Sequence, residues 1–379
     1  MRRRWHGLLL TLLLSATPKS RSKIIVHSVP DLEDGALAIL EELLARGHRP
    51  IVLLERALPR SADVSDLAGA GVTFFPKHSN AGRFHYLTAR VVFTTHGAYR
   101  PHTPSRSQTL VHIGHGEPLG KSTGYWIGDL AARATVATAG STVGKAFRCV
   151  QQGLEPRQVL LVGSPRNDRL IHSNRDEIRP KVMEWLPDRT ETVFIWLPTY
   201  RRHFDGAPEG VEQDTGLPLD RASLERVDSW LEEQHAAMIV KKHPLNHSDP
   251  VVGLSRIRVL DDAAFQSVGL SLYRVLAAAD CLITDASSVW FDFLLTGRPL
   301  ICCFPDIHEY RKSRALNLEP YEEWFPGPFV SSTRELLQEL AHVASGSDRH
   351  AGYRDRLTRA LHPHRDGQSS RRLLDAIGL

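Results

Sequence analysis

Short apolar runs alternate with helical patterns along most of the chain, which has 379 residues. The run Lys23–Ser28 (KIIVHS) precedes apolar residues at helical spacing over Gly35–Ala45, and a second run follows at Pro50–Glu55. Unbroken apolar runs of this length are typical of strands that are buried on both faces of a parallel sheet. The first half therefore predicts an α/β domain with a mainly parallel sheet. Its further strands are expected at 72–75, 90–94, 109–113, 135–137 and 158–162.

The same alternation starts again in the second half. A strand is predicted at Val193–Leu197, a helix at Ala222–Gln234 and a strand at Ala237–Lys241. Segment 174–192 is predicted to be a linker, and 200–218, rich in Gly, Pro and Asp, is predicted to be a loop. Two such domains in series should bind ligands where their strands end, because open α/β sheets hold ligands beyond the carboxyl ends of their strands. The remaining elements are strands at 257–260, 281–284 and 299–304 and a closing helix at 369–377.

The first residues follow a different pattern, in which three arginines precede a leucine-rich run that ends near Leu14. The apolar run is too short to span a bilayer. One interpretation is a signal peptide, with its charged start and short apolar centre. The other is an interfacial helix held at an anionic membrane surface by Arg and Lys. A disordered start is a third, weaker alternative.

Charge and cysteine content narrow the class of protein. The formal net charge is +4, but residues 1–23 contain six Lys and Arg and no acid, which leaves the remaining residues at −2. A nearly neutral body argues against a nucleic-acid-binding protein, which would present a broad basic face. Four cysteines in a chain of this length do not form a disulfide framework, and Cys302 and Cys303 lie in an apolar run. A reducing compartment fits this usage.

The first candidate site is Val111–Lys121, where a predicted strand ends in Gly114-His115-Gly116. The flanking glycines allow a sharp turn that leaves His115 unshielded. A histidine has an ordinary pKa near 6.5, so His115 could serve as a general base. The alternative is a turn histidine without chemistry.

The second candidate site is Lys241–His247 (KKHPLNH), where a strand is followed by basic residues and a proline suited to a helix start. Lys242 and His243 at such a terminus would suit a phosphate. The alternative is a solvated basic turn. His243 and His247 are spaced like two metal ligands on a helix, but neither HExxH nor CxxC accompanies them, and we expect no metal.

The third candidate site is the junction at which a strand ends at Asp285 and Ser287 and Ser288 begin a helix predicted at 289–296. Serine hydroxyls beside free backbone N–H groups form an anion site, although helix capping alone would also explain a serine there. Two weaker strand ends carry Arg166 (VGSPRND) and Thr199 with Arg201 (LPTYR). The chain has no Walker loop, no GxGxxG after its first strand and no GxSxG elbow.

In this order and spacing, the motifs resemble the CDP-glycerol glycerophosphotransferase family, the primases and polymerases of teichoic acid synthesis. The resemblance runs from about Lys23 to the C-terminus. It is carried by GHGEPLGK at 114–121, GSPRNDRL at 163–170, PTYR at 198–201, KKHP at 241–244, LITDASSVWFDF at 282–293, PGPFVSSTREL at 326–336 and HPHRDGQSSRR at 362–372.

The resemblance implies a GT-B fold, with two Rossmann-like domains that face each other across a cleft and a C-terminal helix that crosses back to the first. It implies transfer of glycerol phosphate from CDP-glycerol to a hydroxyl of a lipid-linked or polymeric acceptor, with release of CMP and no tightly bound cofactor. The domains are then a membrane-surface segment at 1–22, an acceptor domain at 23–178 joined by 350–379, and a donor domain at 190–349.

Carried over residue by residue, His115 matches the base toward the acceptor and His243 matches the histidine beside the donor pyrophosphate. Gly116 and Glu117 fall on the acceptor side. The donor-binding set implied by the motifs is Arg166, Thr199, Arg201, Lys242, Thr284, Asp285, Ser287 and Ser288. The family commonly has Thr at position 117 and Tyr at 286, where this chain has Glu117 and Ala286, so a different donor such as CDP-ribitol stays open.

Two other hypotheses remain. The same architecture could serve a GT-B glycosyltransferase that uses a nucleotide sugar, because fold does not fix substrate. A cleaved signal at 1–16 would instead indicate an exported binding protein. The resemblance favours a short primase-like transferase held peripherally at the cytoplasmic face of the cell membrane, with residues 1–22 as the anchor.

Overall fold

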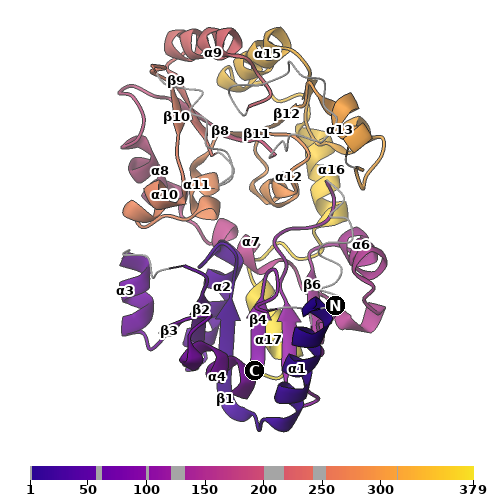
Figure 1. Ribbon diagram of the computed structural model, residues 1–379. Helices are drawn as coiled ribbons and strands as arrows, with labels where there is room; N and C mark the ends of the chain where they lie inside the picture. The colour runs from indigo at the N-terminus through magenta and orange to yellow at the C-terminus, as the bar shows by residue number, and fades with distance from the viewer. Residues whose placement is uncertain are drawn as a thin grey trace. The chain divides into compact units, whose positions relative to one another are not determined.

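The computed structural model describes residues 2–56, 62–99, 102–120, 133–199, 217–241, 253–313 and 315–379. Within these ranges the chain divides into two compact units. The first contains residues 1–118, 123–172 and 361–379, and the second contains residues 119–122 and 173–360. Both are α/β units built on a parallel sheet, as the alternation of apolar runs predicted (Figure 1).

The first unit contains a seven-stranded parallel sheet with the order β3-β2-β1-β4-β5-β6-β7. Its strands are β1 (Ser20–His27), β2 (Ile51–Leu54), β3 (Thr73–Pro76), β4 (Ala89–Thr94), β5 (Thr109–His112), β6 (Val136–Ala139) and β7 (Val159–Leu161). Its helices are α1 (Arg2–Ala16), α2 (Asp34–Ala45), α3 (Ala62–Gly69), α4 (Asn80–Thr88), α6 (Thr142–Gln152), α7 (Pro165–Ile171) and α17 (Ser369–Ala376).

Both faces of this sheet are covered, because successive side chains of a strand point to opposite faces. Ile24 and Val26 of β1 pack into a core with α2 and α17, whereas Ile25 packs into a second core with Leu14 of α1 and Tyr86 of α4. Burial on both faces explains why this strand appears in the sequence as an unbroken apolar run.

The second unit contains a six-stranded parallel sheet with the order β10-β9-β8-β11-β12-β13. Its strands are β8 (Thr192–Leu197), β9 (Ala236–Val240), β10 (Ile257–Val259), β11 (Cys281–Thr284), β12 (Leu300–Cys303) and β13 (Phe329–Val330). Its helices are α8 (Arg175–Met183), α9 (Arg221–Glu233), α10 (Asp262–Ser267), α11 (Leu272–Ala278), α12 (Val289–Phe293), α13 (Ile307–Ser313), α14 (Tyr321–Trp324), α15 (Thr333–Ala344) and α16 (Ala351–Leu361).

Two sequence predictions were wrong at the junction between the units. The segment 174–192 is not a linker, because α8 occupies much of it and buries Ile178 and Val182. Its Arg179 donates hydrogen bonds to Ala278 O and to Asp280, which ties α8 to the second unit. The first unit therefore ends at His172 rather than at 178, and the returning C-terminal segment begins at Leu361 rather than at 350.

The N-terminal segment also differs from its prediction. Helix α1 is followed directly by β1, which begins at Ser20, so the sheet starts before the predicted boundary at residue 22. Leu14 is fully buried against the sheet, and Lys19 Nζ donates to the carbonyls of Leu14 and Leu87. Residues 1–22 are therefore in part an element of the first unit. None of the described helices is long and apolar enough to cross a membrane.

The strand order locates one special position in each sheet. The chain winds outward from β1 in one direction and from β4 in the other, and it does the same from β8 and β11. At such a topological switch point the connections leave a crevice beyond the carboxyl ends of the two central strands, where ligands bind in open α/β sheets. Ligand-binding and catalytic residues are therefore expected beyond the carboxyl ends of the pairs β1/β4 and β8/β11.

Candidate active site

The turn that carries His115 follows β5 at the carboxyl edge of the first sheet. Gly114 and Gly116 have φ values of 73° and 142°, which side-chain-bearing residues rarely adopt. A Cβ atom at Gly114 would lie 2.6 Å from a guanidinium nitrogen of Arg148. Both glycines are therefore required by the backbone, and the His115 side chain is exposed at the apex of the turn.

Two buried arginines hold this turn from behind. Arg166 Nη1 donates to the carbonyl oxygen of His115 at 2.7 Å, and Arg148 Nη2 donates to that of Gly116 at 3.0 Å. The two side chains are only 6% and 3% exposed. Hydrogen bonds from charged donors are stronger than neutral ones, so they fix the peptide units on which the exposed imidazole is mounted.

The Glu117 side chain is buried beside one of these arginines. Its side chain is 3% exposed, its Oε1 accepts a hydrogen bond from the Gly140 amide at 2.7 Å, and it lies 3.8 Å from Arg148 Nη2. Burial lowers the pKa of the Arg148 guanidinium and the charge of Glu117 opposes that shift. The acceptor-side assignment of Glu117 stays a prediction; in the structure its side chain is the buried counter-charge of an arginine that positions the turn.

Arg166 was predicted to contact the donor. It lies in the first unit at the start of α7, and the hydrogen bond to the His115 carbonyl gives it a positioning role there. Its charge also lowers the pKa of Glu33, which burial raises to about 7. A contact between Arg166 and the donor stays a prediction.

His96, which the sequence argument did not single out, lies beside His115. It follows the adjacent strand β4, and the two imidazole rings are 4.9 Å apart between centroids and inclined by 49°. Its Nδ1 is 3.0 Å from Thr95 Oγ1, and burial lowers its pKa. The signal was present in the sequence, since Thr94-Thr95-His96-Gly97 ends a strand with a histidine before a glycine, as the His115 motif does.

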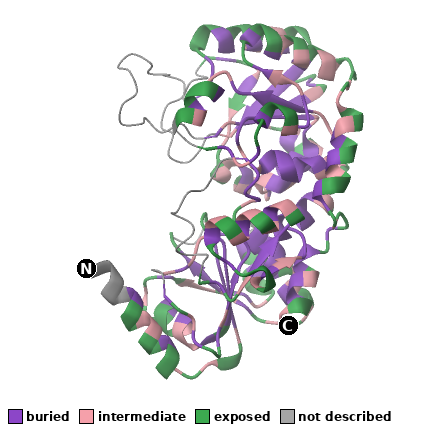
Figure 2. Ribbon diagram, turned by 90° about the vertical axis from the view of Figure 1, so that its right-hand side faces the viewer, coloured by how far each residue is buried: buried purple, intermediate pink, exposed green. Residues whose placement is uncertain are grey.

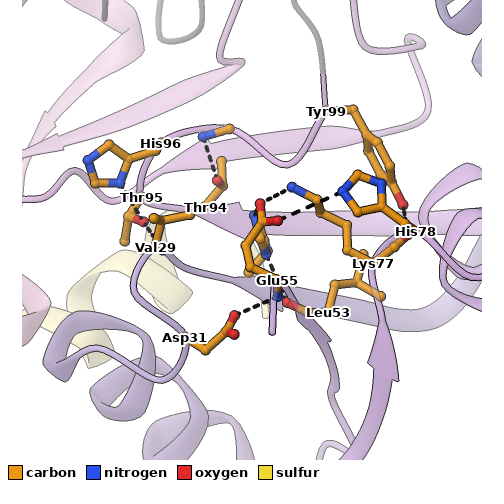
Figure 3. A network of polar contacts seen from close by, with 12 residues as sticks. Val29, Asp31, Leu53, Glu55, Lys77, His78, Thr94, Thr95, His96 and Tyr99 are labelled. Atoms are coloured by element: carbon orange, nitrogen blue, oxygen red, sulfur yellow. Dashed lines mark hydrogen bonds and ion pairs between the residues drawn. The ribbon is translucent and has the colours of Figure 1, made fainter. Parts of the chain in front are cut away.

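A network of charged groups continues along the same edge (Figure 3). Glu55, after β2, forms an ion pair with Lys77 at the end of β3, and its Oε2 lies 3.8 Å from His78 Nε2 (Figure 3). Its Oε1 lies 3.5 Å from His27 Nε2 at the end of β1. His27 Nδ1 is 2.8 Å from the carbonyl of Leu53, and burial lowers the pKa of His27 to about 4. His27 is therefore a neutral imidazole at the β1/β4 switch point.

The corresponding switch point of the second unit contains a different arrangement around Asp285. This side chain is fully buried after β11, and its carboxyl oxygens accept hydrogen bonds from the Thr199 backbone N–H at 3.0 Å and from the Thr199 hydroxyl. Thr284 Oγ1 donates to Leu197 O at 2.7 Å, which ties β11 to β8. Tyr321 OH donates to the Asp285 carbonyl at 2.5 Å.

These bonds change the interpretation of the predicted donor-binding residues. The side chains of Asp285, Thr199 and Thr284 are buried and join β8 to β11, so they shape the site rather than line it. Ser287 and Ser288 are half-buried at the start of α12 and are more exposed than those three side chains. The predicted helix 289–296 is α12 followed by a 3₁₀ turn that ends at Gly297, where φ is 70°.

The motif that begins with His115 also contributes to the second unit. Leu119 and Gly120 belong to that unit, and the Gly120 carbonyl accepts a hydrogen bond from Asn317 N at 2.8 Å. A Cβ atom at Gly120 would meet the carbonyl of Ala286, so the glycine permits this close approach. Three predicted site residues lie outside the described ranges, namely Arg201, Lys242 and His243.

Comparison with known proteins agrees with this fold. The family model described as CDP-glycerol:poly(glycerophosphate) glycerophosphotransferase matches residues 10–379. The chain belongs to this family. The family that the sequence motifs predicted is thereby confirmed, and GT-B is confirmed as the fold class, with α17 returning to the first unit.

Curated relatives include both primases and polymerases. The teichoic acid ribitol-phosphate primase of Bacillus spizizenii is 24% identical in an alignment 393 positions long, which covers 97% of this chain and 93% of that protein. The teichoic acid ribitol-phosphate polymerase TarL of Staphylococcus aureus is 25% identical and covers 71% of this chain, which spans only 47% of the polymerase. The relatives thus act in teichoic acid synthesis.

Solved structures show the same fold. The wall teichoic acid polymerase TagF superposes with a TM-score of 0.76 at 20% identity, covering 100% of this chain and 93% of that chain. A TagF variant solved with CDPG gives 0.77 at 19% identity, covering 98% and 91%. A putative UDP-N-acetylglucosamine 2-epimerase from Listeria monocytogenes shares the fold more distantly, with a TM-score of 0.55 at 12% identity over 94% and 96% of the two chains.

Proposed function

We propose that this protein transfers a polyol phosphate from a CDP-polyol to an acceptor hydroxyl in the synthesis of a teichoic-acid-like polymer. The observation that carries the proposal is the exposed His115 side chain on a turn fixed by two buried guanidinium groups. A general base must be positioned before it can remove a proton in the transition state. Family membership supplies the reaction type.

In the proposed reaction, His115 accepts the proton of the acceptor hydroxyl as its oxygen attacks the β-phosphorus of the donor. The bond between that phosphorus and the bridging oxygen breaks, and CMP leaves with the bonding electrons. The product is a phosphodiester. The transferred group and CMP both carry negative charge, so catalysis depends on position and electrostatic stabilisation.

The donor belongs, in this proposal, to the second unit. Ser287 and Ser288 offer hydroxyl groups where ligands approach a parallel sheet, beside the first backbone N–H groups of α12. The hydrogen bonds between Thr199 and the buried carboxyl group of Asp285 hold this junction in place. The resemblance adds His243, Lys242 and Arg201 as further groups near the donor phosphates.

We propose CDP-glycerol as the donor on the description of the family, and CDP-ribitol as the specific alternative. The alternative is supported by the ribitol-phosphate primase that aligns along 97% of this chain. The proposed acceptor is a lipid-linked glycan or a polyol-phosphate chain, used at the cytoplasmic face of the membrane by a peripherally bound enzyme.

Release of CMP tests the reaction directly. The full chain would be incubated with CDP-glycerol or CDP-ribitol and a lipid-linked acceptor, and CMP would be quantified by chromatography. We expect acceptor-dependent CMP release with one of the two donors and a phosphodiester product by mass spectrometry. UDP- and GDP-sugars form the second arm. Nucleoside diphosphate released from a sugar donor, with no CMP from either CDP-polyol, would contradict the proposal and favour a GT-B glycosyltransferase.

A further inference from the structure

Helix α1 carries an outward apolar face. The described residues include seven large apolar side chains that are exposed, and four of them belong to this helix: Leu8, Leu9, Leu12 and Leu13, at 53%, 56%, 59% and 44% exposure. The opposite side of α1 packs on the sheet through the fully buried Leu14. Figure 2 shows the exposed residues of α1 along its outer side. The helix is thus held firmly while a strip of leucine faces solvent.

A basic cleft lies just beyond the end of this helix, at the amino edge of the first sheet. Its volume is about 630 Å³. The strands β1, β4 and β5 lie side by side and begin at this edge, since Ser20 pairs with Ala89 and Val91 pairs with Thr109. The residues that line the cleft are Lys19, Arg21, Arg90, Arg106, Ser107 and Thr109.

The three arginines of this cleft have no counter-charge in the part of the chain that the structure describes. Elsewhere arginines such as Arg46 and Arg311 form ion pairs with carboxylates, but no hydrogen bond or ion pair within the described residues involves the side chain of Arg21, Arg90 or Arg106. All three are exposed, and no acidic side chain lines the cleft. Like charges gathered in this way repel one another and attract anions.

Lys19 connects the two features. Its ammonium group donates to the carbonyls of Leu14, Thr17 and Leu87, so it fixes the end of α1 against α4 while its side chain forms one wall of the cleft. Burial lowers its pKa. The leucine face and the arginine cleft therefore adjoin each other on the first unit.

We propose that this surface docks on an anionic bilayer, with the arginine cleft binding the phosphate of a lipid headgroup and the α1 leucines entering the interface. The arrangement combines the two forces that bind interfacial helices, apolar burial and attraction to anionic lipid. A free phosphate would use the cations but would leave the leucines in water. The proposal deepens the membrane association suggested under the proposed function.

The position of the surface is compatible with the chemistry. The cleft lies at the amino ends of β1, β4 and β5, whereas His96 and His115 follow the carboxyl ends of β4 and β5. A phosphate bound in the cleft is therefore at the opposite edge of the sheet from the candidate base. Lipid binding and phosphoryl transfer can be measured and mutated separately.

Vesicle sedimentation tests the proposal. The full chain would be mixed with phosphatidylglycerol or phosphatidylcholine vesicles at low ionic strength, and the bound fraction measured. The triple variant R21Q/R90Q/R106Q should bind phosphatidylglycerol on the order of 100-fold more weakly, because each basic side chain near an anionic surface contributes roughly a factor of five. Leu9→Ser with Leu12→Ser should weaken binding to both kinds of vesicle. Added salt should weaken vesicle binding by the wild-type protein more than vesicle binding by the triple variant.

The matched control removes the same charge elsewhere. Lys181, Arg189 and Arg258 are exposed cations of the second unit, and K181Q/R189Q/R258Q changes the net charge by the same amount. Much smaller loss in the control than in the cleft variant supports a specific surface. Equal loss in both would overturn it, since long-range charge would then suffice. Circular dichroism and thermal melting must show that each variant is folded.

Two further measurements separate this inference from its alternatives. Calorimetry with glycerol 1-phosphate tests binding of a free phosphate; affinity for it equal to that for the vesicles would overturn the lipid assignment. CMP release in a vesicle-free assay with a water-soluble acceptor should be unchanged in the cleft variant. A protein that binds phosphatidylglycerol through the cleft but releases no CMP would leave this inference standing and remove the proposed reaction.

Discussion

The two sheets have the same winding, yet their switch points differ in chemistry. Around β1/β4, the carboxyl edge carries imidazoles and a charged Glu55–Lys77 pair, and the exposed His115 lies beside His96. At β8/β11, the carboxyl group of Asp285 is buried and bonded to Thr199. The first arrangement suits proton transfer, and the second suits a fixed backbone that binds a ligand. A fold that is repeated within one chain thus provides two positions for chemistry without specifying which chemistry each one performs.

The largest expected effect comes from removing the proposed base. His115→Ala should lower kcat for CMP release by a factor of about 10² to 10⁴, because a positioned general base contributes that much. Donor binding, measured by calorimetry, should be nearly unchanged because the donor is assigned to the other unit. His308→Ala, an exposed histidine on α13, is the matched control. Full activity of His115→Ala would remove the proton-transfer role from the first switch point.

Substitutions of Glu117 distinguish a role in positioning the His115 turn from direct contact with the acceptor. Glu117→Thr, which introduces the residue common in the family, should lower the free energy of unfolding by about 3 kcal/mol, since it removes the buried counter-charge of Arg148. Glu117→Gln removes the same charge but keeps an oxygen that can accept the hydrogen bond from Gly140 N, so it should cost less, about 2 kcal/mol. Urea denaturation measures both. A Glu117→Thr protein as stable as the wild type, but with a raised KM for the acceptor, would support the acceptor-side assignment.

At the second switch point, Asp285→Asn should lower the free energy of unfolding by about 2 kcal/mol. The substitution keeps the shape of the side chain but weakens the hydrogen bonds from the Thr199 amide and hydroxyl. Donor affinity should fall with it, while the pH profile of kcat should keep its shape because no proton transfer is assigned there. Asp188→Asn, at an exposed position, is the control. A shifted pH profile would mean that both switch points take part in proton transfer.

The last prediction concerns the pH dependence of stability rather than activity, and it lies at Glu33, which caps α2 by accepting a hydrogen bond from Ala36 N. Burial raises its pKa from 4.5 to about 7, so the folded state holds this proton more tightly than the unfolded state. Its contribution to the free energy of unfolding therefore falls as pH rises from about 4.5 to about 7, by roughly 1.4 kcal/mol per pKa unit. Glu33→Gln should remove this slope, measured as the difference from wild type at pH 5 and pH 8.

The pH dependence of Glu33 has to be read from the difference in stability between the wild type and Glu33→Gln, because the wild type alone contains a second titrating group. The pKa of His27 is lowered to about 4, so the unfolded state binds its proton more tightly and stability rises with pH between about 4 and 6.5. The two slopes have opposite signs. A pH-independent difference between the wild type and Glu33→Gln would show that Glu33 does not titrate in this range.

Much of this protein follows from its sequence alone. Apolar runs gave most strands within one or two residues, because a strand covered on both faces must be apolar throughout. β11 was predicted with the bounds Cys281–Thr284 that the structure has. The motif order was sufficient to name the family, and the strand-end glycines around His115 were sufficient to select that histidine as exposed.

Tertiary structure decided what the site residues do. Glu117, Arg166, Thr199 and Asp285 all belong to sequence motifs, but burial and hydrogen-bond partners make them supports rather than exposed groups. The position of His96 beside His115 follows from the parallel pairing of β4 with β5, which the sequence does not specify. The arginine cleft likewise joins positions that are far apart in the sequence, because three strand starts meet at one edge. A sequence pattern records which residues a strand end carries, whereas their burial and their neighbours are set by the packing of the whole unit.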